Sequence, residues 1–120
     1  MKNVKFDMKD DILLAELFGE IDHHSAASLR IVIDAALRAF RTRHLVLDYS
    51  KVEFMDSSGI GLAMGRYRYT CDRGGMMVIV PGNETISRLL SLSGIFGTIP
   101  RSKNIRLAVS YIEEEKRRLV

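Results

Sequence analysis

Two short runs rich in apolar and β-branched residues, at 44–49 and 76–80, most constrain what this chain can fold into. Polar or turn-forming residues bound each run, and a segment with helical spacing follows each one. Such runs are typical of strands buried in a sheet that has helices on its faces. Strands and helices alternate from the second strand onward, which predicts right-handed crossovers and an α/β domain with the 44–49 strand in a central position.

An antiparallel hairpin is expected at the start of the chain. Two short apolar stretches, at 4–8 and 12–18, are separated by the polar residues 9–11, and Gly19 is the predicted end of the second strand. A break at 50–51 is expected before residues 52–55 lead into the next turn. The hairpin adds antiparallel pairing, so the sequence predicts a mixed sheet of about four or five strands flanked by about four helices.

Four segments predict helices, because their apolar residues recur at spacings of three and four. The first follows Asp22, the predicted N-cap, and the second runs from about residue 58 to 73, before Gly74 and Gly75. A short helix is expected after 81–83, then a loop or brief edge strand at 95–100, then a terminal helix at 104–119. The apolar residues that define these faces are Ala26, Leu29, Ile33, Leu37 and Phe40; Ile60, Met64, Tyr67 and Cys71; Ile86, Leu89, Leu90 and Leu92; and Ile105, Ala108, Val109 and Ile112.

Size and charge exclude several classes of protein. With 120 residues, of which 47% are hydrophobic and 28% charged, the chain is predicted to form one globular domain over 1–120. The net charge of +3 comes from scattered basic residues, so direct nucleic-acid binding is not favoured, and Arg66, Arg68 and Arg73 are interpreted as solvated surface. No apolar run suits a secretory signal or a membrane span, which predicts a cytoplasmic protein.

The run Asp56-Ser57-Ser58-Gly59 lies where the 52–55 segment gives way to the second helix. The first N–H groups of a helix have no partner within it, and the helix dipole favours negative charge, so this is a natural position for a phosphate. Asp56 and Ser57 are good N-cap residues and could simply satisfy those groups. Ser58 comes just past the cap, and Gly59 has no side chain to obstruct it. Ser58 is therefore the first candidate for phosphorylation, and Ser57 is the second.

The glycines of the second helix suggest a rival from another class, a nucleotide-binding protein. Gly59, Gly61 and Gly65 are similar to a dinucleotide fingerprint. That fingerprint needs an acidic residue for the ribose at the end of the next strand, which here ends in Val80-Pro81. Close approach of the helix to the sheet explains the glycines better, and nucleotide binding at 59–65 stays as the alternative.

Catalysis and metal binding have little support. A serine hydrolase needs a histidine beside the serines, and His44 precedes a strand whose far end carries them. His23 and His24 could approach more closely, because the loop after Gly19 and the serine loop are expected at the same edge of the sheet. No Gly-x-Ser-x-Gly turn surrounds the serines, however, and two histidines without a third ligand make a poor metal site. Cys71 has no partner for a disulfide, and its helical position predicts a small buried side chain. No catalytic residue, metal site or cofactor is predicted.

Four segments together resemble a known family. They are Phe-Met-Asp-Ser-Ser-Gly-Ile-Gly at 54–61, Gly-Glu-Ile-Asp-His-His at 19–24, Met-Gly-Arg-Tyr at 64–67 and Ser-Gly-Ile-Phe at 93–96. The chain closely resembles, over essentially its whole length, the anti-sigma factor antagonists of the STAS family, specifically the sporulation stage II AA type. The Asp-His-His run favours that type over general stress-response relatives, which stay as the alternative within the family. Ser25 stands where relatives often have threonine.

This resemblance implies a small α/β domain with a mixed sheet, and it implies a switch. Ser58 would be phosphorylated by the partner anti-sigma factor, a serine kinase that uses ATP and magnesium, and a separate serine phosphatase would reverse the reaction. The unphosphorylated protein would bind the kinase and release the sigma factor, whereas the phosphorylated protein would not bind. The chain would thus be a substrate and no enzyme. The implied partner-binding residues are Asp22, His23, His24, Ser58 and Gly61.

Overall fold

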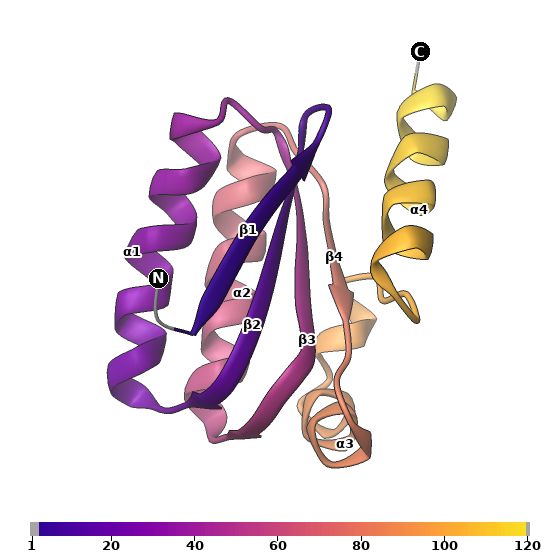
Figure 1. Ribbon diagram of the computed structural model, residues 1–120. Coiled ribbons are helices and arrows are strands. Elements are labelled where there is room, and N and C mark those ends of the chain that lie inside the picture. The colour runs from indigo at the N-terminus through magenta and orange to yellow at the C-terminus, as the bar shows by residue number, and fades with distance from the viewer. Residues whose placement is uncertain (1–2, 120) are drawn as a thin grey trace.

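A mixed β-sheet forms the centre of the fold in the computed structural model, which describes residues 3–119 (Figure 1). Within those residues the four strands are β1 (Val4–Lys9), β2 (Ile12–Ile21), β3 (His44–Met55) and β4 (Met77–Val80), in that order across the sheet. β1 and β2 are antiparallel, whereas β2, β3 and β4 are parallel. The predicted hairpin, the mixed sheet and the interior position of the 44–49 strand are confirmed.

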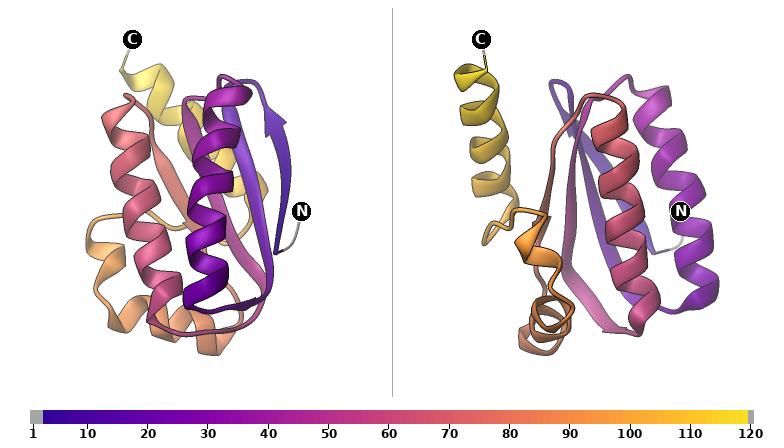
Figure 2. Two further views of the ribbon diagram at one scale, coloured as in Figure 1. Left: turned by 90° about the vertical axis from the view of Figure 1, so that its left-hand side faces the viewer. Right: turned by 180° about the vertical axis from the view of Figure 1, so that it is seen from behind.

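Helices cover both faces of the sheet. α1 (His23–Ala39) and α2 (Ser57–Asp72) lie side by side on one face, and α4 (Ile105–Arg118) packs on β3 and β4 from the other (Figure 2). α3 (Glu84–Leu92) and a 3₁₀ turn at Ile95–Gly97 follow β4, and α3 contacts β3. The predicted α/β class is confirmed. Over the part of the chain that the structure describes, none of these helices has the length and apolar character that crossing a bilayer requires.

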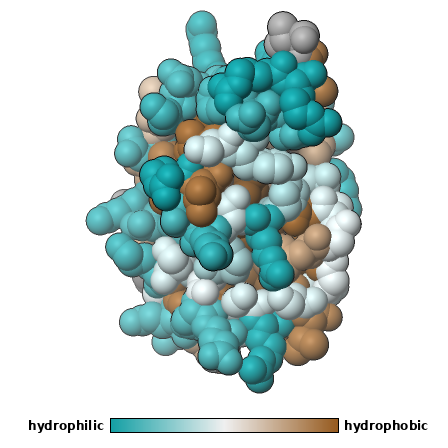
Figure 3. All heavy atoms as spheres, turned by 90° about the vertical axis from the view of Figure 1, so that its right-hand side faces the viewer, coloured by the Kyte–Doolittle hydropathy of each residue, from teal (hydrophilic) through white to brown (hydrophobic). Residues whose placement is uncertain are grey.

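The core consists of two apolar layers, because side chains alternate between the two faces of each strand. The larger layer lies between the sheet and the α1–α2 pair and includes the fully buried side chains of Leu13, Leu47 and Tyr49. The smaller layer joins Val46 and Val78 to α4. Figure 3 views the molecule from the α4 side, where hydrophilic side chains dominate and apolar ones are visible in patches. As predicted, α4 contributes buried residues to this layer: Ala108, Val109 and Ile112.

Two strands run farther than the sequence predicts. β3 continues through the predicted break at 50–51, because residues 51, 52, 54 and 55 still pair with β2. β2 passes Gly19, its predicted end, and reaches Ile21. Gly19 has φ +77° and lies beside a shift in the β2–β3 register, so it distorts the strand without ending it. Beyond β1, the Asn3 side-chain amide donates to the carbonyls of Phe18 and Glu20 at 2.8 and 3.1 Å, which satisfies this part of the edge of β2.

Three further differences occur at the ends of helices. Residues 95–97 form the 3₁₀ turn and no edge strand, although Arg101 makes a single bridge to Ile79. Leu92 is the last residue of α3 and is 79% exposed. Phe40 follows α1 as its C-cap and is exposed. Leu92 and Phe40 lie at the C-terminal ends of their helices with exposed side chains, so neither belongs to the core.

The inward face of α2 differs from the predicted one. Ile60, Met64 and Tyr67 are only partly buried, and Cys71 is exposed, so the prediction of a buried cysteine is wrong. α2 packs on α1 as well as on the sheet, so its buried face is turned away from the apolar stripe that the sequence shows. Its buried residues are Gly59, Leu62, Ala63, Arg66 and Thr70.

Candidate functional site

The ends of β2 and β3 bring two helix N-termini together. Ile21 at the end of β2 pairs with Met55 at the end of β3, and one residue separates each strand from the helix that follows. The N–H of Asp56 donates to the carbonyl of Ile21 at 3.2 Å, which joins the two turns directly. The unpartnered N–H groups of both helices therefore lie at one edge of the sheet. The prediction that the Asp22 loop and the serine loop share an edge is confirmed.

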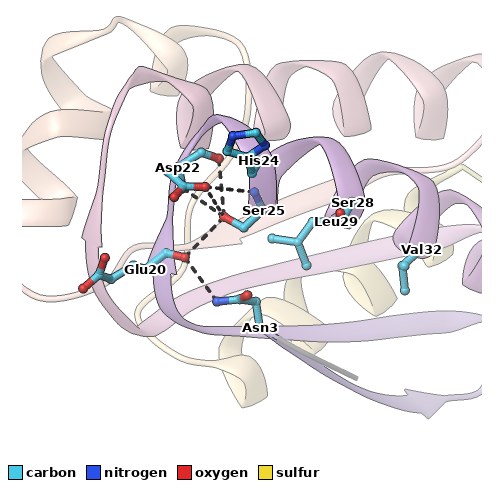
Figure 4. A pocket seen from close by; sticks show the side chains of 8 residues that line it. All are labelled: Asn3, Glu20, Asp22, His24, Ser25, Ser28, Leu29 and Val32. Atoms are coloured by element: carbon cyan, nitrogen blue, oxygen red, sulfur yellow. Dashed lines mark hydrogen bonds between the residues drawn. The ribbon is translucent and has the colours of Figure 1, made fainter.

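Asp22 caps α1, as predicted (Figure 4). Its Oδ1 accepts the N–H of Ser25 at 2.9 Å, while the Oγ of Ser25 accepts the N–H of Asp22 at 2.9 Å. This reciprocal arrangement is a capping box, so serine at position 25 satisfies the helix start. These hydrogen bonds, chiefly the one from the backbone of Ser25, lower the pKa of Asp22. Its carboxylate is therefore ionised at neutral pH while remaining exposed at the edge of the molecule.

Asp56 caps α2, which leaves the two serines different roles. Its Oδ1 accepts the N–H of Ser58 at 2.8 Å, and Ser57 is the first helical residue, with an exposed side chain. Ser58 is partly buried, in a hollow that α1 helps to line. Within residues 3–119 its hydroxyl makes no hydrogen bond, although its N–H does. Ser58 thus presents an uncommitted hydroxyl at a helix N-terminus, but it is less exposed than the sequence suggests.

Gly59 fixes the start of α2 against the sheet. The hydroxyl of Tyr49, a buried residue of β3, donates to the carbonyl of Gly59 at 2.8 Å. A Cβ on Gly59 would lie only 2.4 Å from the Sδ of Met55, so the close approach requires glycine. Burial raises the pKa of Tyr49 well above its ordinary value, which keeps the hydroxyl protonated as a donor. The serines are therefore held on a rigid support.

Packing does not require glycine at positions 61 and 65, because a Cβ on Gly61 or Gly65 would meet no atom within 4 Å. Close packing on the sheet, which is the sequence interpretation of these glycines, is therefore correct for Gly59 and wrong for these two. They border a hollow of about 280 Å³ between α1 and α2. All three glycines lie inside α2, and only Asp56 separates it from β3, so there is no glycine-rich turn of the dinucleotide kind. The hollow is lined by His23, Ala26, Ala27, Arg30, Ser58, Gly61, Leu62, Gly65 and Arg66.

A buried ion pair joins the two helices beside this hollow. The Nε of Arg66 on α2 lies 2.7 Å from the Oδ1 of Asp34 on α1, and the Arg66 side chain is only 6% exposed. Burial lowers the pKa of Arg66, whereas the charge of Asp34 raises it. Arginine stays protonated in proteins, so the pair carries full charges. The interpretation of Arg66 as solvated surface is therefore wrong.

Comparison with known proteins identifies the family. The family model described as the STAS domain matches residues 3–111. The chain belongs to the STAS domain family. An anti-sigma F factor antagonist of Paenibacillus polymyxa is 34% identical over 113 residues, which cover 92% of this chain and 97% of that protein. This relative places the STAS domain described here among the anti-sigma factor antagonists, so the predicted family is confirmed.

Solved structures share the fold of this STAS domain. The phosphorylated form of SpoIIAA, a cell fate determinant of Bacillus, has a TM-score of 0.70 and 24% identity, covering 91% of this chain and 98% of that one. An anti-sigma factor antagonist from Mycobacterium paratuberculosis has a TM-score of 0.79 and 23% identity, with 92% of each chain covered. The predicted single STAS-type domain with a mixed sheet is confirmed.

The first turn of α1 divides the predicted contact residues of the STAS domain between two hollows. His23 lines the hollow that contains Ser58 and Gly61. Asp22 and His24 line a second one, of about 570 Å³, on the other side of that turn (Figure 4). The second hollow also contains Asn3, Glu20, Ser25, Ser28, Leu29 and Val32. The five predicted residues therefore form one edge of the molecule but do not converge on a single pocket.

His44 lies far from the serines, as predicted, because it begins β3 and they follow its last residue. Its Nδ1 accepts the N–H of Met76 at 2.9 Å, and its Nε2 lies 3.5 Å from Asp11, which also binds Lys116 at 2.8 Å. Burial, the largest effect, lowers the pKa of His44. His44 thus ties β3 to its neighbours at the opposite end of the sheet. No cluster of three or more metal-binding side chains occurs in the described part of this STAS domain.

Proposed function

We propose that this STAS domain is a non-enzymatic anti-sigma factor antagonist whose binding to the anti-sigma factor is switched off by phosphorylation of Ser58. The observation that carries the proposal is the place of Ser58, whose uncommitted hydroxyl lies at the N-terminus of α2 beside that of α1. The Paenibacillus polymyxa relative, named for antagonism of an anti-sigma F factor, supports the role, and the phosphorylated SpoIIAA structure supports the modification.

The proposed partner is an anti-sigma factor that is also a serine kinase. It holds ATP and magnesium and transfers the γ-phosphoryl group to the Oγ of Ser58, with release of ADP and of the hydroxyl proton. A serine phosphatase hydrolyses the ester and restores the hydroxyl. The unphosphorylated form binds the complex of kinase and sigma factor and releases the sigma factor. Because the kinase consumes ATP, the proposal places this chain in the cytoplasm.

Phosphorylation is expected to change binding without unfolding the domain. A phosphate adds about −1.5 to −2 charges at neutral pH, and the dipole at the start of α2 favours that charge. Asp56 and the Tyr49–Gly59 hydrogen bond hold the turn in either state. In a partner interface the same charge must be desolvated, and a loss of about 4 kcal/mol lowers affinity roughly a thousandfold.

The proposed contact surface is the edge formed by the two helix starts. Asp22 at the N-cap of α1, His23 and His24 in its first turn, and Ser58 and Gly61 on α2 lie there as hydrogen-bonding and unobstructed groups. Asp22 and His24 have exposed side chains, so a partner can reach them without rearrangement of the fold. The supporting residues Asp56, Ser57 and Gly59 cap or anchor the turn that carries Ser58.

Incubation with the serine kinase from the same source, ATP and magnesium tests the proposal. Intact-mass measurement should show one added phosphate, which is absent in Ser58→Ala. Ser57→Ala is the matched control, because it removes the adjacent, more exposed hydroxyl and should still accept phosphate. Pull-down should then show binding of the unmodified protein and loss of binding after phosphorylation.

Two outcomes would contradict the proposal. Phosphate that persists in Ser58→Ala, or disappears equally in both variants, would remove Ser58 from its assigned role. Stoichiometric dinucleotide binding without any phosphate transfer would favour the nucleotide-binding alternative at 59–65. A phosphate at Ser58 added by a kinase of the general stress response would keep the switch and change only its pathway.

A further inference from the structure

The hollow beside Ser58 holds more positive than negative charge. Arg66 lines it from α2, and Arg30 and His23 line it from α1. Asp34 is paired with Arg66, whereas Arg30 makes no ion pair with any carboxylate in residues 3–119. Arg30 is also close enough for its charge to add to the effect of burial in lowering the pKa of Arg66. Asp34 therefore balances the charge of Arg66 and leaves the charge of Arg30 without an ion-pair partner among residues 3–119.

Arg66 is a donor whose capacity is not met by the protein. Its residue is 5% exposed, and its Nε lies 2.7 Å from the Oδ1 of Asp34. The guanidinium carries five N–H donors, and among residues 3–119 it forms an ion pair with Asp34 alone. A buried cation that borders an open hollow with unused donors is a feature of sites that receive an anion.

The small residues of the hollow leave space for such an anion. Gly61 and Gly65 on α2 place no side chain in it, and α1 contributes Ala26 and Ala27. The N-terminus of α2 adds the positive end of its dipole. Asp56 is the opposing charge, since its carboxylate lies at the N-cap and accepts the Ser58 N–H. Arg30, exposed and without an ion-pair partner, is the group best able to move toward a phosphate.

We propose that the phosphate on Ser58 is held within this chain, in the hollow between α1 and α2, by a hydrogen-bonded contact with Arg30 in front of the fixed charge of Arg66. The proposal rests on the phosphorylation of Ser58 proposed above. It explains how the modification acts, because the phosphate and Arg30 together fill the space that Gly61 and Gly65 leave open. A side chain of the partner can then no longer enter the hollow, and an acidic one is also repelled.

A titration followed by phosphorus NMR tests this contact. Phosphoserine is inserted at position 58 during translation, so the experiment does not need the kinase, and failure of the clamp is distinguishable from failure of the proposed function. An arginine contact stabilises the dianion, so Arg30→Ala should raise the second pKa of the phosphate by about half a pH unit. Arg68→Ala is the matched control, since it removes the same charge from an exposed position on α2 outside the hollow.

The expected result is a shift in Arg30→Ala and in a second variant, Arg30→Gln, with the Arg68→Ala titration matching that of the parent. His23 and Asp56 also face the phosphate and are unchanged in all four proteins, so their effects cancel in the comparison. Equal pKa values in the parent and both Arg30 variants would overturn the proposal. So would an equal shift in Arg68→Ala, which would reduce the effect to net charge.

Discussion

Replacement of Asp34 by asparagine is expected to destabilise the fold by about 3 kcal/mol, because it leaves the buried guanidinium of Arg66 without a counterion. The Arg66 side chain is 6% exposed, whereas that of Asp34 is 16% exposed, so the lower end of the usual cost of breaking a buried pair applies. Urea unfolding of the parent and of Asp34→Asn at neutral pH measures this loss of stability. With a slope of roughly 1.5 kcal/mol per molar urea, the midpoint should fall by about 2 M.

Two comparisons isolate the ion pair. Asp72→Asn removes an exposed carboxylate of α2 and should change stability by less than about 0.5 kcal/mol. The double variant Asp34→Leu with Arg66→Met replaces the pair by apolar side chains and should recover most of the loss, since desolvation of the charges offsets much of their attraction. If Asp34→Asn unfolds at the same urea concentration as Asp72→Asn, the buried pair does not hold α1 and α2 together as argued.

Three further perturbations test the support around the site. Gly59→Ala should lower the free energy of unfolding by about 1–2 kcal/mol, because the new Cβ would lie 2.4 Å from the Met55 sulfur. Gly61→Ala should stabilise α2 by up to about 1 kcal/mol, because its Cβ meets no atom within 4 Å. A thermal unfolding series that ranks the two variants the other way would contradict this description of the packing. Burial depresses the pKa of His44, so its contribution to stability is complete above its unfolded value of about 6.5 and is lost as the pH falls below that value through its lower folded pKa. Urea midpoints between pH 7 and 5 should therefore fall more steeply in the parent than in a His44→Gln variant. Asp22→Ala should weaken kinase binding, measured by calorimetry, while loss of the cap costs at most about 2 kcal/mol; unchanged affinity would remove Asp22 from the interface.

The starts of the helices were predictable from the sequence, because a helix N-cap depends on one side chain and on the backbone of the next few residues. Asp22 caps its helix as predicted, and Asp56, one of the two N-cap candidates at 56–57, caps the other. Both are legible in the sequence because a side chain that accepts an N–H two or three residues ahead acts within a single turn. The alternation of strands and helices also predicted that both caps lie at one edge of the sheet. Capping and the order of strands and helices both follow from residues that are close in sequence. The motif at 56–59 therefore predicted its own local geometry.

Pairing between strands was less predictable. Polar residues at 50–51 and Gly19 resemble breaks, yet β2 and β3 continue past them because each supplies hydrogen bonds to the other. The neighbouring strand that stabilises each of them is distant in sequence. At Gly19, a shift in the β2–β3 register lets the pairing continue beyond the glycine. At both places, pairing with the neighbouring strand outweighed the local tendency of these residues to end a strand.

The amino-acid sequence by itself determined the class of fold, the two capped helix starts and the serine in the first turn of the second helix, because these follow from local hydrogen bonding and from hydrophobic spacing. Only the tertiary structure decided which side of α2 is buried, since α1 and the sheet both cover it. Tertiary packing also made Arg66 an interior cation with Asp34 as its counterion and left Gly61 and Gly65 open. Those features depend on how two helices pack against each other, and spacing within one helix does not encode the position of the other.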